Sequence, residues 1–207
     1  MTWPAIVVRP VHVADLKPDG ELMPVYVYVI EHPDGRVLVD TGMTRLHPLV
    51  EDMDPRILTI GPDEHDELDP ATIDIVVNTH LHFDHCGGNH RYPGVPIYVQ
   101  SQELDDALTQ PDYTIREWVE APGLQYRPVT GEVELLPGVP LVPGPGHTRG
   151  SQMVVVETDD RPVVIVGDLA ITHHDLDDPQ TPGQLRVREL DPSEVWLAHQ
   201  HEPWRPR

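Results

Sequence analysis

The sequence predicts an α/β protein in which two β-sheets pack face to face, with helices on the outside. Short runs of β-branched and aromatic residues dominate and occur near both ends of the chain, whereas the helical segments fall mainly between them. This distribution is typical of a layered sandwich. The 207 residues suffice for one well-buried core and no linker divides them, so we expect a single domain over residues 1–207.

Two β-hairpins are the clearest elements. In the first, strands at residues 25–30 and 36–40 flank the turn sequence His-Pro-Asp-Gly. In the second, strands at 152–157 and 162–166 flank the turn Thr-Asp-Asp-Arg. Further strands are expected at residues 73–78, 96–100, 133–136, 139–142 and 194–198.

The helices are fewer, in keeping with the 24 prolines. They are expected at residues 46–53, 101–109, 114–119 and 184–190, with Ser101 as the N-cap of the second. The stretch from Thr44 to Pro70 is polar, contains several prolines and is long for a connection. Such a stretch is either a surface excursion or a binding flap, and we favour the flap.

Charge and cysteine content exclude several classes of partner. The chain carries 14 basic and 35 acidic residues, a formal net charge of −21, which argues against nucleic acid and against anionic membrane surfaces. No apolar run approaches the ~20 residues that span a bilayer. The first residues lack a basic region and an apolar core, so we expect no signal peptide. With Cys86 as the only cysteine, no intrachain disulfide can form, and a cytoplasmic location is expected.

The segment Thr-His-Leu-His-Phe-Asp-His at residues 79–85 is the most informative part of the chain. It places His80, His82, Asp84 and His85 directly after an apolar run that begins at Ile73. Imidazole nitrogen with carboxylate oxygen is the ligand set of zinc and, less selectively, of iron, cobalt or manganese. The alternative is a polar turn that happens to be rich in histidine. We favour the metal site, because ligand-type residues recur downstream in similar settings.

Those residues are His147, Asp168 and His199, and each follows or ends a buried strand. His147 lies in a glycine–proline loop, Asp168 follows an apolar strand through a glycine, and His199 closes the run Val-Trp-Leu-Ala. Strand ends of one sheet system meet at one rim, so the three are expected to join the first cluster. His201, two positions further, is the rival of His199 for the last ligand position, and we favour His199.

Five histidines and two aspartates are too many for one tetrahedral ion and suit two, which favours a catalytic centre. We assign His80, His82 and His147 to one divalent ion and Asp84, His85 and His199 to the other, with Asp168 bridging. Asp40, at the end of a strand, either orients a ligand histidine or caps the turn at Gly42. Cys86 is expected to be a small packed residue behind the loop rather than a ligand.

The motif His80-x-His82-x-Asp84-His85, followed by Gly-Gly-Asn, resembles the metallo-β-lactamase superfamily. Within it, the chain is most similar to the N-acyl homoserine lactonases, the quorum-quenching hydrolases. The resemblance extends to residues 37–42, 97–100, 145–148 and 167–168. It implies an αββα sandwich of two mixed sheets flanked by helices, with a two-metal centre at one edge. The family's ligands fall on the same seven residues that their placement at strand ends indicates.

The chain departs from these lactonases at the third position after the expected bridging aspartate. A tyrosine that contacts the substrate carbonyl is typical there, and this chain has Ile171. Tyr26, Tyr28 and Tyr113 are the alternatives for its role. The segment between Asp168 and His199 is also short for the family and is expected to lack one full helix that the family has there.

The resemblance implies a dinuclear-metal hydrolase, most simply with two zinc ions, that opens a lactone or ester through attack by a metal-bridging hydroxide. Asp84 is expected to pass a proton to the leaving alkoxide. Alternatives are a hydrolase of thioesters, aryl esters or phosphodiesters, a diiron redox centre, and a non-catalytic metal-binding domain. The sequence fixes neither the acyl-chain preference nor the native metal, and it leaves a homodimer open.

Overall fold

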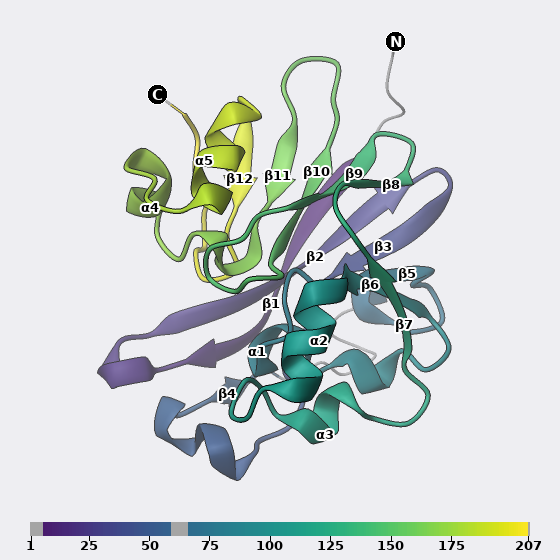
Figure 1. Cartoon of the computed structure of the whole chain (residues 1–207), viewed down its shortest axis with the longest axis vertical. Coiled ribbons are helices and arrows are strands. Elements are labelled where there is room, and N and C mark those ends of the chain that lie inside the picture. The colour runs from purple at the N-terminus through teal and green to yellow at the C-terminus, as the bar shows by residue number, and fades with distance from the viewer. Residues whose placement is uncertain (1–5, 59–65, 207) are drawn as a thin grey trace.

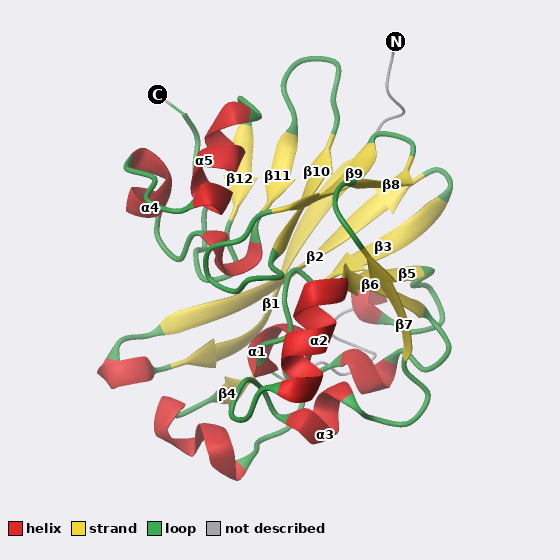
Figure 2. Cartoon of the chain, in the orientation of Figure 1, coloured by secondary structure: helices red, strands yellow, loops and turns green. Residues whose placement is uncertain are grey.

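The computed structural model describes residues 6–58 and 66–206, and two mixed β-sheets form its centre (Figures 1 and 2). The seven strands of the first sheet lie in the order β4 (Arg56–Ile57), β1 (Val7–Leu16), β2 (Met23–His32), β3 (Gly35–Val39), β5 (Ile75–Val77), β6 (Pro96–Gln100) and β7 (Gln125–Val129). The five strands of the second sheet lie in the order β12 (Glu194–Trp196), β11 (Val163–Ile165), β10 (Gln152–Val156), β9 (Val139–Pro143) and β8 (Val133–Leu136).

Short helices flank the two sheets. The α-helices described are α1 (Phe83–Cys86), α2 (Ser101–Thr109), α3 (Arg116–Val119), α4 (His173–Asp177) and α5 (Pro182–Glu189). Single 3₁₀ turns occur at η1 (Pro18–Gly20), η2 (Pro48–Met53), η3 (Asp66–Leu68), η4 (Asn89–Arg91) and η5 (Gly167–Leu169). Helix α2 contacts β6 and β7, while α4 and α5 contact each other beside the second sheet (Figure 1).

The central strands of both sheets, such as β2 and β10, are buried on two faces, which explains their nearly continuous apolar sequences. On β10, Val154 and Val156 join Tyr28 of β2 in the core between the sheets. The alternate residue Val155 packs in a separate core with Leu176 of α4, under the outer helices. Alternate side chains of the strand therefore pack into an inner core between the sheets and an outer core under the helices. The helices and sheets together form the αββα arrangement.

Both predicted hairpins are present, as β2–β3 and β10–β11, and every other predicted strand has a counterpart. Strands β1, β4 and β7 were not predicted. The helix expected from residue 46 is instead the 3₁₀ turn η2, which begins at Pro48. Ser101 is not an N-cap: Gln100 holds that position, and the Ser101 hydroxyl donates to the carbonyl of Val129.

Two further expectations concern long connections. The segment after Asp168 contains α4 and α5, and α5 is the counterpart of the helix predicted at residues 184–190. Each of these helices begins with a capping box, at Thr172 and Thr181. The 44–70 stretch contains η2, β4 and η3, and residues 59–65 of the proposed flap lie outside the described residues.

The strand directions bring many carboxyl ends to one region. Strands β3 and β5 are parallel neighbours in the first sheet. In the second sheet β11 and β12 are parallel, and β9 runs in the same direction because β10 is antiparallel to both β9 and β11. The loops that follow these five strands carry the polar residues singled out in the sequence.

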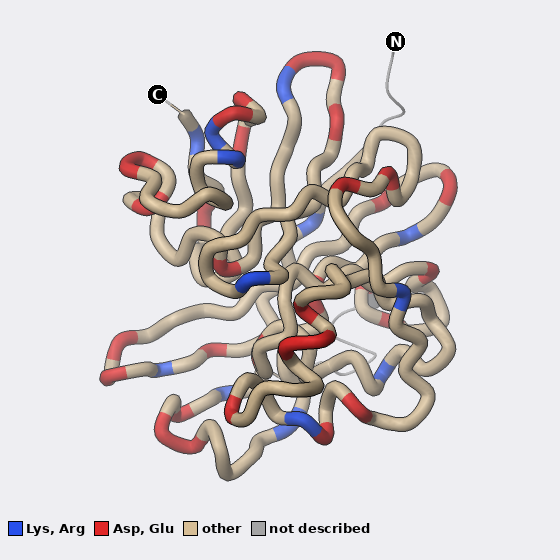
Figure 3. Tube along the Cα trace, viewed as in Figure 1, with Lys and Arg blue, Asp and Glu red and all other residues tan. Residues whose placement is uncertain are grey.

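Acidic residues are spread over loops and helices throughout the trace, not gathered in one patch (Figure 3). This distribution fits a solvated acidic surface. Among the described helices, none is long and apolar enough to cross a membrane.

Candidate metal centre

Seven predicted side chains meet where the ends of the two sheets face each other. Loops after β5 and helix α1 supply four of them, and loops after β9, β11 and β12 supply one each. They form three overlapping groups, and within each group the ligand atoms lie within 4.8 Å of one another. The groups are His80, His82 and His147; His80, His85 and Asp168; and Asp84, His85 and His199.

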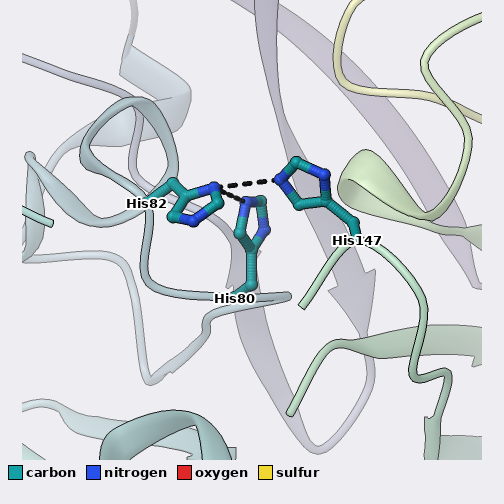
Figure 4. A group of neighbouring side chains, drawn as sticks. All are labelled: His80, His82 and His147. Carbon is teal, nitrogen blue, oxygen red and sulfur yellow. Dashed lines mark hydrogen bonds between the residues drawn. The ribbon is translucent and has the colours of Figure 1, made fainter. Parts of the chain in front are cut away.

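The first group consists of three imidazoles that point toward one another (Figure 4). The His82 Nδ1 atom lies 3.1 Å from His80 Nε2 and 2.9 Å from His147 Nε2. Ligand nitrogens about 2.0–2.1 Å from one tetrahedral zinc ion are roughly 3.3 Å apart, since an edge of a tetrahedron is ~1.6 times its radius. The spacing of these nitrogens therefore suits a common ion.

Asp168 lies between this group and the next. Its Oδ1 atom is 3.1 Å from His85 Nε2 and 3.2 Å from His199 Nε2. Its Oδ2 atom is 3.5 Å from His147 Nε2 and 3.8 Å from His80 Nε2. One carboxylate thus presents a different oxygen to each set of histidines, which is the geometry that a bridging ligand needs.

Buried hydrogen bonds leave the Nε2 atoms of the second set free to bind an ion. The Nδ1 atom of His85 is 2.8 Å from Asp40 Oδ2, and that of His199 is 2.7 Å from the carbonyl of Pro24. Each such contact fixes the ring and directs Nε2 into the site. The His85 Nε2 and Asp168 Oδ1 atoms are buried and lack hydrogen-bond partners in the described structure, despite the short distance between them. Donor atoms that converge without bonding one another fit a divalent ion.

The electrostatics of the site also favour cations. Burial opposes protonation of His199, but the carboxylate of Asp168 outweighs it and raises the pKa of His199 to about 8. The same competition, with Asp168 and Asp84 prevailing, raises the pKa of His85 well above its usual value. Burial is itself the main reason why the pKa of His82 is lowered to about 4, so that imidazole is a neutral ligand at pH 7.

Asp40 resolves one alternative left by the sequence. Its carboxylate contacts the His85 ring and accepts hydrogen bonds from the backbone N–H and the hydroxyl of Thr79. It therefore orients a site histidine. Asp40 itself has a left-handed φ of 59°, a costly conformation for a buried non-glycine residue. At Gly167 a similar φ of 54° goes with close packing, because a Cβ there would collide with the Thr79 hydroxyl.

The alternative residues do not reach the centre. The His201 Nδ1 atom pairs with the Tyr26 hydroxyl at 2.9 Å, whereas His199 contacts both aspartates. Cys86 is fully buried and its thiol contacts the carbonyl of Leu81, so it is the packed residue that was expected.

The hydroxyls of the three tyrosines considered for the place of Ile171 all have hydrogen-bond partners within the described structure. The Tyr28 hydroxyl donates to the carbonyl of Leu197, and the Tyr113 hydroxyl donates to Glu103 Oε1 at 2.6 Å. The Tyr26 hydroxyl is paired with His201. All three hydroxyls are thus engaged elsewhere in the described structure.

Two supporting residues escaped the sequence reasoning. Glu103 and Thr148 form a 2.6 Å hydrogen bond directly behind the first histidine group. Glu103 lies in the first turn of α2, where a glutamate is common for reasons of helix stability alone. The only available signal was its neighbourhood in the fold, which no local pattern reveals.

Two cavities open beside the first histidine group. One of about 700 Å³ is lined by His82, Phe83 and Tyr113 together with apolar residues of η2. The other, of about 390 Å³, is lined by His82, His147 and Arg149. Both cavities therefore reach the first group at His82.

Residues 20–205 match the sequence profile of the family described as the Metallo-beta-lactamase superfamily. Among characterised proteins, an N-acyl homoserine lactonase from Bacillus sp is 33% identical over 175 residues, which cover 76% of this chain and 69% of that protein. A second N-acyl homoserine lactonase, AttM from Rhizobium johnstonii, is 29% identical, with 79% of this chain and 71% of that protein covered.

A solved structure has the same architecture. It is an N-acyl homoserine lactone hydrolase with the product N-hexanoyl-L-homoserine bound at its catalytic metal centre. Its TM-score is 0.77 at 26% sequence identity, with 96% of this chain and 94% of that chain covered.

Proposed function

This chain belongs to the metallo-beta-lactamase superfamily, and we propose that it is a dinuclear-metal hydrolase that opens N-acyl homoserine lactones. The observation that carries the proposal is the position of Asp168, whose two oxygens face two sets of histidines. The lactonase relatives and the product-bound structure of similar fold support the choice of substrate.

In this proposal the residues hold two divalent ions as the geometry suggests. His80, His82 and His147 bind the first ion, Asp84, His85 and His199 bind the second, and Asp168 contacts both. Zinc is the simplest choice for imidazole and carboxylate ligands, with iron, cobalt and manganese as alternatives. When bound, the ions lower the pKa of shared water from about 15.7 to roughly 7 and polarise the substrate carbonyl.

The chain's own residues supply binding and proton transfer. The cavity beside Phe83 is bordered by Leu49, Val50 and Met53, which suits an acyl chain next to a polar ring. Asp84 Oδ2 lies 3.6 Å from His85 Nε2 and 3.5 Å from His199 Nε2, within the second set. From there it delivers a proton to the alkoxide oxygen that is released when the carbonyl carbon–oxygen bond of the ring breaks.

Location and assembly belong to the same proposal. A single, fully buried cysteine suits a reducing cytoplasm. A homodimer is compatible with the exposed Leu46 and Leu49 on the segment around η2. The molar mass measured by light scattering in solution, divided by the mass of one chain, gives the number of subunits.

A substrate panel tests the proposed activity. Zinc-loaded and cobalt-loaded protein is assayed with acyl homoserine lactones of several chain lengths, and with thioesters, phosphodiesters and aryl esters. We expect kcat/KM to be highest for the lactones. A higher kcat/KM for a thioester or a phosphodiester would contradict the proposed lactone substrate and identify that class as the substrate. The proposed metal centre would be unaffected by that result.

Metal removal is expected to lower thermal stability, and more so at high pH. Ions at 100 times their Kd stabilise a fold by ~2.7 kcal/mol each, and 1 kcal/mol shifts Tm by ~2–4 °C at this size, so loss of both ions is expected to lower Tm by roughly 10–20 °C. In the metal-free protein, the raised pKa of His199, about 8, contributes stability that is present below pH 6.5 and lost as the pH rises through 8. Metal binding releases protons and strengthens with pH.

The difference in Tm between loaded and metal-free protein is therefore expected to widen between pH 6.5 and pH 8.5. Calorimetric scans at the two pH values measure it. Restoring zinc after removal of the chelator is the control, and it should return the original Tm. A difference that stays constant or narrows would contradict the proposed coupling of His199 to the metal.

A further inference from the structure

Glu103 is a fully buried carboxylate that the proposed reaction does not use. Its side chain is 0% exposed, and it lies in the first turn of α2. No lysine, arginine or histidine forms an ion pair with it in the described part of the chain, although burying an unpaired charge is costly. The cost of burying this carboxylate must therefore be offset by other favourable interactions.

Three neutral donors hold this carboxylate. Its Oε1 atom accepts hydrogen bonds from the backbone N–H of Leu81 at 2.8 Å and from the Tyr113 hydroxyl at 2.6 Å. Its Oε2 atom accepts one from the Thr148 hydroxyl at 2.6 Å. All three partners donate, which is the pattern of an ionised carboxylate, an acceptor only.

These contacts reach both loops of the first histidine group. Leu81 stands between His80 and His82, and Thr148 follows His147. The second loop also fits closely against the start of α2, because a Cβ at Gly150 would collide with the backbone of Glu103. Figure 4 shows the three imidazoles that these two segments present, and the Glu103 carboxylate links the two segments.

Charge gives a second reason for its position. Imidazole binds a metal ion in its neutral form, and among the described residues Asp168 is the only carboxylate that pairs with this group. The second group has Asp84 as a member and Asp40 directly behind His85. Glu103 is the corresponding negative charge behind the first group.

We propose that Glu103 is a positioning residue that sets the affinity of the first metal site and leaves the second largely unaffected. It holds the 80–82 and 147–148 segments at a fixed separation and places a buried negative charge behind three neutral ligands. The inference rests on the proposed dinuclear centre. The selectivity for one ion distinguishes it from a general contribution to folding.

The test measures the affinity of each ion separately. Wild type, Glu103→Ala and Glu103→Gln are titrated with zinc against a competing chromophoric chelator, and bound metal is counted by elemental analysis. In Glu103→Ala we expect one of the two ions to bind about 10–100 times more weakly, the range for loss of a group that supports a ligand, and the other to change less than about threefold. Glu103→Gln keeps the shape and loses the charge, so at least a threefold weakening of the same ion is expected.

Two further variants identify the ion and control for charge. Asp40→Asn removes the carboxylate behind His85, and it should weaken the other ion instead. Glu120→Ala also removes one negative charge, but from an exposed ion pair with Arg116, and both affinities should stay at wild-type values.

The outcomes separate the inference from the proposed function. Equal weakening of both ions in Glu103→Ala, or wild-type affinities in Glu103→Gln, would overturn the positioning role. If Glu103→Ala does not fold, Glu103→Gln decides alone. Failure of wild type to bind two ions would instead refute the dinuclear centre on which the inference rests.

Discussion

Replacing Asp168 by asparagine is expected to lower kcat at least ~100-fold, because both ions lose a ligand in one step. The carboxylate offers Oδ1 to His85 and His199 and Oδ2 to the first group. An asparagine keeps the volume, but one of its two terminal atoms becomes an N–H₂ donor, which cannot bind a cation. Steady-state kinetics and metal content of the purified variant measure the effect.

Asp178→Asn is the matched control for this substitution. It makes the same chemical change at an exposed position on the C-terminal side of α4. Its kcat and its metal content should equal those of wild type. Near-normal turnover of Asp168→Asn with two ions bound would contradict the proposal that Asp168 bridges the ions.

Replacing His147 by alanine is expected to lower turnover by a similar factor of at least ~100 through the first ion alone. Its Nε2 atom is 2.9 Å from His82 Nδ1, and its side chain is 30% exposed, so the cavity that the substitution leaves is open to water. The fold should therefore tolerate the change. We expect the variant to retain about one ion per chain and its near-native circular dichroism.

His201→Ala provides the comparison for that variant. It removes an exposed imidazole that pairs with Tyr26 and does not belong to the three ligand groups. Activity and metal content near the wild-type values are expected. Loss of one ion in His201→Ala would instead give His201 the position proposed for His199.

The sequence alone predicts that the seven candidate side chains come together, and the reason is local. Each of the seven residues lies in a short segment that follows an apolar strand, and strand ends are fixed in space by the sheet. Asp40 could be singled out in the same way, although its choice between turn and histidine needed the long-range contact with His85. Glu103 could not, because its three partners lie 10 to 45 residues away.

The fold was predictable to a similar depth. The hairpins have strong local signals, namely two apolar runs around a polar turn. Strand β1 lacked this signal, because Pro10, His12 and Asp15 interrupt its apolar pattern. Its extended conformation depends on antiparallel pairing with β2. Pro48 turned the helix expected at residue 46 into a tighter turn, since proline favours the first helical positions and excludes a preceding turn of helix.

The proposed ligands come from both sheets, and this division ties catalysis to packing far from the site. Four of them follow β5, and the other three follow strands of the opposite sheet. The distance between the proposed ligands of the first sheet and those of the second is therefore set by the residues packed between the two sheets, such as Val77 and Ile165. A substitution that lets one layer slide over the other would change the spacing between the proposed ligand groups without altering any ligand. In this protein, the interior packing that stabilises the fold therefore also sets the geometry on which its chemistry depends.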